Sequence, residues 1–328
     1  MPGSVTSVFS EPEDFEAAPR EDGVVSMLIT GPGRFRARLT RVTLHRLRLL
    51  AAEEHLPRIA FVAVPADAIP VLLPTGSGSS PIWCGIGVRA DEIITLGPNQ
   101  RVHARTDGPS RWGTIRLPAR ELARYGRALS GSGFAVPQSV ARWQPPLAAR
   151  RELRELHQAG IRVAEIRAGL LTDGEAAARA GAAVDPCPGR LPVDGATRWG
   201  CVRAAALGRS RRFEDLPQMQ PFIGVAEISA ALGVSDQMLR RGCDEHLGMS
   251  PTSYLRLRPM SRVYRVLRRG DPDAASVSKV ARRYGFRQLG RFAADYRALF
   301  GELPSATLRR GLRPGMADLV LRQPRRSA

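Results

Sequence analysis

Four polar residues in the C-terminal third of the sequence are spaced so that they would share one face of a helix. Gln237, Arg240, Arg241 and Asp244 stand at i, i+3, i+4 and i+7, which places them on one face of a helix. Gln and Arg side chains form paired hydrogen bonds with adenine and guanine edges, and Arg also binds phosphate. The chemistry that this stripe predicts is recognition of nucleic acid.

A second stripe lies about 50 residues later, because the whole segment is an internal repeat. Its members are Arg287, Gly290, Arg291 and Ala294. At an offset of 52 residues, Val225, Ile228 and Gly233 match Val277, Val280 and Gly285. At an offset of 53, Leu239, Cys243, Leu247, Gly248 and Pro251 match Phe292, Tyr296, Phe300, Gly301 and Pro304. A repeat of this kind is one supersecondary unit used twice.

Each copy of the repeat predicts two short helices joined by a glycine turn. Val225, Ile228 and Leu232 share one face of a first helix, and Gly233 permits the turn. Ser235 is a good N-cap for a second helix, in which Leu239, Cys243 and Leu247 are the expected buried residues. The pattern is that of a helix-turn-helix motif.

The charge of the chain agrees with a polyanionic partner. The formal net charge is +18, carried by 48 Arg and one Lys, Lys279. Residues 221–315 hold 17 basic and 8 acidic residues, so half of the excess lies in less than a third of the chain. A GC-rich genome also explains a preference for Arg over Lys, but it does not require that Arg be left unbalanced by acid. The distribution favours binding of nucleic acid by this segment.

Residues for metal or covalent chemistry are sparse. Cys84, Cys187, Cys201 and Cys243 are far apart, and no pair has the spacing of a zinc site. His103 is not part of the HxH pattern that a metal-binding cupin needs. There is no G-x-S-x-G elbow, and Cys84 in the apolar stretch PIWCGIGV suits a core. We therefore expect no enzyme, no metal and no cofactor.

The preceding part of the chain predicts an antiparallel β domain. Residues 23–140 contain short apolar stretches separated by Gly/Pro turns, as in a β-barrel or cupin-like fold. In RFRARLTRVTL, Phe35, Ala37 and Leu39 share one face and the phase then slips to Val42 and Leu44, which would suit a bulge. RIAFVAV and RWGTIRL are further strand candidates, and LPARELARYGRAL begins a helix.

The fold class is therefore α+β, with five segments. Residues 1–22 are acidic and are expected to be disordered; 23–140 form the β domain; 141–220 form a helical linker; 221–315 form an all-α domain with two helix-turn-helix motifs; 316–328 form a basic tail. Within the linker, the amphipathic stretch 150–171 is the candidate contact of a homodimer. The sequence has neither an apolar leader nor a membrane-spanning stretch, so we expect a cytoplasmic protein.

The repeat resembles the AraC/XylS family of bacterial transcription regulators. VAEISAALGVSDQMLRR, GMSPTSYLRLR and VARRYGFRQLGRFAADYRALFGELPSATLRR carry the likeness, which covers residues 221–311. The second unit is most similar to the branch that contains regulators of ethanolamine use. The resemblance implies two recognition helices, joined by a long helix, in successive major grooves, and a cupin-like sensing domain in 23–140.

Carried over by position, twelve residues are the implied DNA-binding set. They are Ser235, Asp236, Gln237, Met238, Arg240, Arg241, Arg287, Gln288, Leu289, Gly290, Arg291 and Ala294. Gln237, Arg240 and Arg291 are the expected readers of base edges. The chain departs from the family at Pro259, which predicts a kink in the joining helix, at Ala294, where Arg is frequent, and at Gly242–Cys243, which replace larger apolar residues.

Three hypotheses follow for the whole chain. The first is an effector-responsive transcription regulator that binds operator DNA as a homodimer. On this hypothesis the protein is associated with the nucleoid, and RNA polymerase is a further candidate partner. The second is a DNA-targeted enzyme, a repair or ligand-modifying N-terminal domain delivered by the same DNA-binding module. The third is a DNA-binding protein whose N-terminal domain only dimerises. The first is the reading that we adopt.

Overall fold

The computed structural model describes residues 3–18, 23–44, 46–76, 78–130, 135–166, 224–270 and 276–311. These residues divide into a β-rich N-terminal unit and a helical C-terminal unit, each described by itself. The predicted α+β class is confirmed. Residues 167–220 of the expected helical linker and the basic tail at 316–328 lie outside the described residues.

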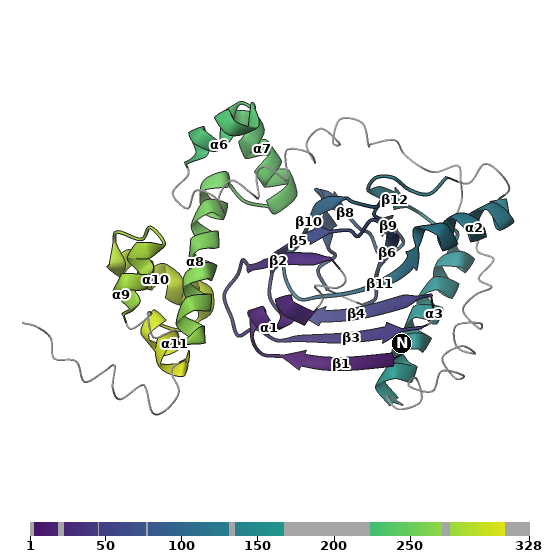
Figure 1. Ribbon diagram of the computed structural model, residues 1–328, viewed down its shortest axis with the longest axis horizontal. Helices are drawn as coiled ribbons and strands as arrows, with labels where there is room; N and C mark the ends of the chain where they lie inside the picture. Colours follow the sequence, from purple (N-terminus) through teal and green to yellow (C-terminus); the bar gives the residue numbers. More distant parts are fainter. Residues whose placement is uncertain are drawn as a thin grey trace, which may run out of the picture. The chain divides into compact units, whose positions relative to one another are not determined.

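The N-terminal unit contains two open antiparallel sheets (Figure 1). The larger has the order β1-β3-β4-β11-β6-β9-β12, and the smaller has the order β2-β5-β10-β7-β8. The strands are β1 (Gly3–Phe9), β2 (Val24–Ile29), β3 (Ala37–Thr43), β4 (Arg48–Glu54), β5 (Arg58–Ala63), β6 (Ala68–Pro74), β7 (Ile82–Trp83), β8 (Ile86–Gly87), β9 (Ile93–Thr95), β10 (Arg101–Thr106), β11 (Ser110–Pro118) and β12 (Ala141–Trp143). The predicted antiparallel β domain is confirmed, but its sheets do not close into a barrel.

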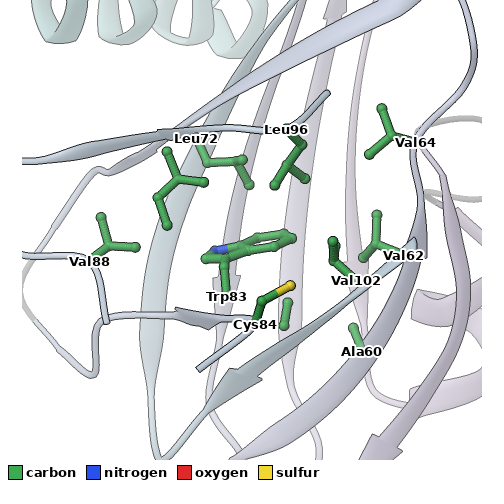
Figure 2. Packing of buried hydrophobic residues seen from close by; sticks show 11 residues of the cluster. Ala60, Val62, Val64, Leu72, Trp83, Cys84, Val88, Leu96 and Val102 are labelled. Carbon is green, nitrogen blue, oxygen red and sulfur yellow. The ribbon is translucent and has the colours of Figure 1, made fainter. Parts of the chain in front are cut away.

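Apolar side chains from both sheets meet in one core. Trp83 lies in the middle of this cluster, among Leu72 of the larger sheet, Leu96 directly after β9, and Val62 and Val102 of the smaller sheet (Figure 2). Cys84, on which a covalent enzyme mechanism would depend, is 2% exposed in the same cluster. Its burial agrees with the prediction that this thiol belongs to the core.

The larger sheet is also covered on its other face, by α3 (Leu147–Ile166) (Figure 1). Ile161 and Ala164 of this helix pack against Val42, Leu49 and other apolar side chains of the sheet. The apolar side of α3, predicted as a contact for a second copy, is therefore occupied within the unit. The helix belongs to the β-rich unit rather than to a separate linker, because an amphipathic helix buries its apolar side on the nearest apolar face.

The bulge predicted in RFRARLTRVTL does not occur in the pairing of β3 with β4, because both faces of β3 are buried. The pairing of β3 with β4 runs without interruption from Ala37 opposite Glu54 to Thr43 opposite Arg48. Leu39 faces the second sheet, whereas Val42 and Leu44 face α3, so both sets are buried without any shift of register. Burial on both faces of a strand removes the simple alternation on which the prediction relied.

Residues 3–18 are ordered, so the prediction of a disordered N-terminus is wrong for them. β1 pairs along its whole length with β3, and α1 (Pro12–Ala17) follows. Phe15 of α1 is buried and contacts the rings of Phe9 and Phe35. The prediction relied on the acidic composition of this segment and did not account for the packing of these three aromatic rings.

His157 gives the N-terminal unit a predicted pH dependence. The ring lies against Gly113 of β11, is 1% exposed, and donates from Nε2 to the carbonyl oxygen of Leu50 at 2.9 Å. Burial lowers the pKa of His157 below its ordinary value of 6.5, with the Leu50 hydrogen bond acting in the opposite direction. As the pH falls below 6.5, the unfolded chain binds a proton that the folded unit refuses, so stability falls by up to about 1.4 kcal/mol per pH unit.

Trp83, Trp112 and Trp143 all lie in this unit, so tryptophan fluorescence can follow its urea unfolding between pH 7.5 and 5. We expect His157→Gln to lose much of the pH dependence, and His55→Gln, at an exposed position, to retain it. An unchanged slope in His157→Gln would assign the pH dependence to other groups.

The C-terminal unit consists of six helices in its described residues. They are α6 (Val225–Leu232), α7 (Asp236–Leu247), α8 (Pro251–Arg269), α9 (Val277–Arg283), α10 (Leu289–Phe300) and α11 (Pro304–Gly311). In the N-terminal unit, α2 (Ala119–Ser130) is the helix predicted from the stretch LPARELARYGRAL. No described helix has both the length and the apolar character needed to cross a membrane.

The joining helix α8 continues through Pro259 without a break. Proline removes one backbone hydrogen bond there, but buried side chains on both sides of it, including Tyr254 and Val263, hold the helix in place. Ser250 caps the helix by accepting a hydrogen bond from the backbone nitrogen of Ser253 at 3.2 Å. The helix that must fix the distance between the two motifs is therefore a single element.

Candidate nucleic-acid interface

The first helix-turn-helix unit is α6 and α7, joined at Gly233. This glycine has φ 65°, a left-handed conformation that side chains with a Cβ disfavour. Ser235 then caps α7, its Oγ accepting from the backbone nitrogen of Met238 at 3.2 Å. Ile228, Leu232, Leu239, Cys243 and Leu247 are buried, as the repeat predicts. The local signals thus fix which side of α7 faces outward.

The predicted recognition stripe lies on that outward side. Gln237, Arg240, Arg241 and Asp244 are all exposed, as is Met238 at 56%. The side chains of Gln237 and Arg240 make no hydrogen bond or ion pair with the described residues, which leaves their donors free for a ligand. Ser235 and Asp236 are exposed at the start of the helix, where the positive end of its dipole favours an anion.

Gly242 lies in the interior of α7, and the structure predicts that it weakens this helix. A Cβ built at this position meets no atom within 4 Å. We therefore expect Gly242→Ala to raise the free energy of unfolding by about 1 kcal/mol, because alanine loses less backbone entropy in a helix. Chemical denaturation followed by far-UV circular dichroism measures the change; a decrease in stability would show that the site is sterically restricted.

The second unit repeats this geometry in α9 and α10 with a larger core. Gly285 supplies the turn with φ 92°. Phe292 and Tyr296 are buried with Val280 of α9 and Leu267 of α8. The Phe292 ring lies 4.8 Å from that of Phe286 and 5.6 Å from that of Tyr296, measured between centroids. Aromatic side chains fill the positions that Leu239 and Cys243 hold in the first unit.

The second recognition stripe is also exposed, whereas one further residue of the implied DNA-binding set is not. Arg287, Gln288, Gly290, Arg291 and Ala294 are open to solvent. Leu289 is partly buried and packs against the core of the second unit, so it positions the start of α10 instead of facing outward. Gln288 occupies the N-cap without a capping hydrogen bond from its side chain, which leaves its amide available.

A polar network that the repeat did not predict anchors α10 to its neighbours. The Tyr296 hydroxyl donates to Thr307 Oγ1 at 2.9 Å, and Thr307 Oγ1 donates to Glu302 at 2.6 Å. Arg310 binds the same Glu302 carboxylate, and Arg256 of α8 forms an ion pair with Asp295 of α10. Glu302, Thr307 and Arg310 are within eight residues of one another but carry no recognisable motif, and Arg256 meets Asp295 only through the packing of α8 against α10.

The ion pairs use both acidic residues of 276–311, Asp295 and Glu302. Seven basic side chains of the same range bond to no other described residue: Lys279, Arg282, Arg283, Arg287, Arg291, Arg297 and Arg309. The surface of the second unit therefore carries uncompensated positive charge. Such a surface attracts a polyanion and suits contact with phosphates.

Comparison with known proteins places the helical unit in a family of domains. Residues 228–310 match the family model described as a helix-turn-helix domain. The probable thc operon regulatory protein of Rhodococcus erythropolis is 38% identical over 85 residues, which cover 26% of each chain. The XylDLEGF operon transcriptional activator of Pseudomonas putida is 36% identical over 87 residues, covering 26% of this chain and 27% of the relative.

Among solved structures, a probable AraC family transcriptional regulator from Rhodopseudomonas palustris is 28% identical. The match covers 32% of this chain and 99% of that one, with a TM-score of 0.30. This chain spans about a quarter of the length of the two curated relatives, so the likeness concerns the helical unit. These relatives are transcription regulators.

Proposed function

We propose that this chain, whose residues 228–310 are a helix-turn-helix domain of the AraC/XylS type, is a sequence-specific transcription regulator that binds DNA through two recognition helices. The observation that carries the proposal is the repeated pair of motifs, each presenting free polar side chains from one exposed helix face. Readers of the major groove use this arrangement, with the second helix of each motif in the groove.

The joining helix has a suitable length for two successive major grooves. α8 has 19 residues, which corresponds to about 28 Å at 1.5 Å per residue. Successive major-groove segments on one side of B-DNA repeat every 34–36 Å or about 10 bp. With one motif at each end, α8 supports a site read in two blocks about one turn apart.

The proposal divides the exposed side chains into two classes. Gln237, Arg240 and Arg291, on the exposed face of the first half of their helices, would contact base edges. The polar residues Ser235, Arg241, Arg287 and Gln288, together with the free basic side chains of α9, would hold phosphates, which fix register without reading sequence.

Hydroxyl-radical footprinting of the full-length protein on a bound DNA tests this proposal. We expect two protected segments about 10 bp apart, and affinity that falls steeply with salt as phosphate contacts release counterions. Protection of a single groove segment would contradict reading by two helices.

An effector is the second part of the proposal, and a cavity in the N-terminal unit supports it. A cavity of about 20 Å³ lies between the sheets, lined by Phe15, Glu16, Val24, Met27, Leu39, Arg58, Ala60, Val62 and Trp112. Two of these residues, Glu16 and Arg58, are buried charged groups; Arg58 pairs with Glu54, which also accepts a hydrogen bond from Trp112 at 2.6 Å. A mostly apolar cavity with a few polar groups suits a small molecule.

The cavity as it stands has room for about one water molecule, so a larger effector would have to displace lining residues such as those of α1. A panel of small metabolites, screened for a rise in melting temperature by tryptophan fluorescence, tests for such a ligand. Ala60→Val, which fills the cavity, should abolish the shift of any compound that binds there. A panel without any shift that depends on Ala60 would argue against sensing at this cavity.

A homodimer is the third part, and its proposed contact is the free edge of the larger sheet. Among the strands that the structure describes, β1 pairs only with β3; it contains no charged residue or proline, and it exposes Val5 and Val8. An uncharged edge strand can add a second copy of itself antiparallel, giving a two-fold interface. Sedimentation velocity should show a dimer that Val8→Lys dissociates and that Val25→Lys, on an edge strand of the smaller sheet, leaves intact.

The last part of the proposal concerns location and partners. The protein would act on operator DNA in the cytoplasm, with RNA polymerase as a further partner.

A further inference from the structure

Three arginines form a row on α8 that is distinct from both recognition stripes. Arg258, Arg262 and Arg265 stand at i, i+4 and i+7, on the side of the helix opposite Met260, Val263 and Leu267, which pack into the core of the second unit. Arg258 is buried, and its guanidinium lies 5.6 Å from the centroid of the Tyr254 ring. We call Arg258, Arg262 and Arg265 the α8 arginine row.

Arg262, the middle member, is partly buried and has no bonding partner among the described residues. Besides burial, Arg258 and Arg265 both lower the pKa of Arg262, whereas Tyr284 acts in the opposite direction. Burial, followed by repulsion from Arg258, lowers the pKa of Arg262 below that of a free arginine. No carboxylate of the described residues offsets this charge.

Such an arrangement is unfavourable in the free protein. Partial burial of a guanidinium removes water from a charge, and a neighbouring charge of the same sign adds to the cost. The cost is offset when an anion arrives with planar oxygen acceptors, because Arg presents its donors as a fork that matches phosphate. Arg262 therefore has the character of an anion-binding side chain that no described residue occupies.

We infer that the α8 arginine row, centred on Arg262, binds a backbone phosphate of DNA between the two recognition helices. This inference rests on the proposed function. If α7 and α10 enter successive major grooves, the helix that joins them spans the intervening minor groove and the two sugar-phosphate strands beside it. Arg262 also interacts electrostatically with Tyr284, the residue directly before the turn glycine of the second motif.

The row would thus be a third contact, independent of sequence, that holds the two readers in register. It lies outside both helix-turn-helix motifs, so the repeat gives no signal for it.

The test compares Arg262→Gln with Arg262→Lys and with Arg309→Gln in the full-length protein. Arg309 is exposed on α11, has no partner among the described residues, and loses the same charge. Affinity for a bound DNA and for an unrelated duplex is measured by fluorescence anisotropy from 50 to 300 mM salt. We expect Arg262→Gln to weaken both by about tenfold at 100 mM salt and to reduce the slope of log K against log salt by about 0.9, the value for one lost phosphate contact. Arg262→Lys should keep the slope, and Arg309→Gln should change it less.

Three results would overturn the inference. Wild-type affinity and slope in Arg262→Gln, with salt-dependent binding by the parent protein, would reject the row and leave the proposed function intact. Weaker binding with an unchanged slope and a lower melting temperature would assign Arg262 to folding. Absence of DNA binding by the parent protein would reject the proposed function together with the inference.

Discussion

A chain that carries both Arg240→Ala and Arg291→Ala is expected to bind its selected DNA at least about 30-fold more weakly than the parent, because each base contact of this type contributes about 1–3 kcal/mol. Both side chains are exposed and free of partners within the described residues, so truncation removes donors without disturbing the fold. The loss should fall on the selected sequence and leave binding to an unrelated duplex within a few-fold of the parent.

The single variants assign each arginine to a block of the site. In a panel of DNAs with one base pair changed at a time, Arg240→Ala should lose discrimination in one block only, and Arg291→Ala should lose it in the other. Arg309→Ala, which removes an exposed charge from α11, is the control and should retain discrimination throughout. Equal weakening on all DNAs in either single variant would make that arginine a phosphate contact.

Phe292→Ala is expected to destabilise the second helix-turn-helix unit by about 3–5 kcal/mol, the usual cost of truncating a buried phenylalanine. Phe292 is 2% exposed and packs between Phe286 and Tyr296, so its truncation leaves a cavity in this core. Four of the five tyrosines of the chain lie in the C-terminal unit, so near-UV circular dichroism reports its unfolding.

Leu239→Ala is the matched variant, because Leu239 holds the position of Phe292 in the first unit of the repeat. We expect it to destabilise α6 and α7, at about 2–5 kcal/mol, and to remove the other footprint block. If each variant removes its own block, the two motifs read DNA separately. Loss of both blocks in either variant would show that the two units fold as one.

The helical unit could be predicted closely from the sequence because its signals are local. Gly233 and Gly285 mark the turns, Ser235 marks a helix start, and the repeated apolar positions mark the buried side of each helix. The exposure of Gln237, Arg240 and Arg291 follows from the same periodicity. Leu289 is the member of the implied site that packs against the core, because it stands one turn before the buried Phe292 on the same side of α10.

The N-terminal unit was harder to predict because long-range pairing decides it. Nothing local shows that β1 joins β3, or that α3 covers the sheet and buries His157 against Gly113. The partnerships of Arg256 with Asp295 and of Glu302 with Arg310 depend in the same way on packing between helices. These pairs must be known before the arginines without a partner, such as Arg262, can be identified.

The most direct test of the central claim, reading by two helices, is selection of bound DNA from a random pool with the full-length protein at controlled salt. We predict an enriched motif with two recognition blocks about one helical turn apart, since α8 holds one motif at each of its ends. A motif with one block would contradict reading by both helices. Absence of enrichment, with binding that disappears at moderate salt, would reduce the +18 charge to non-specific attraction and contradict the account.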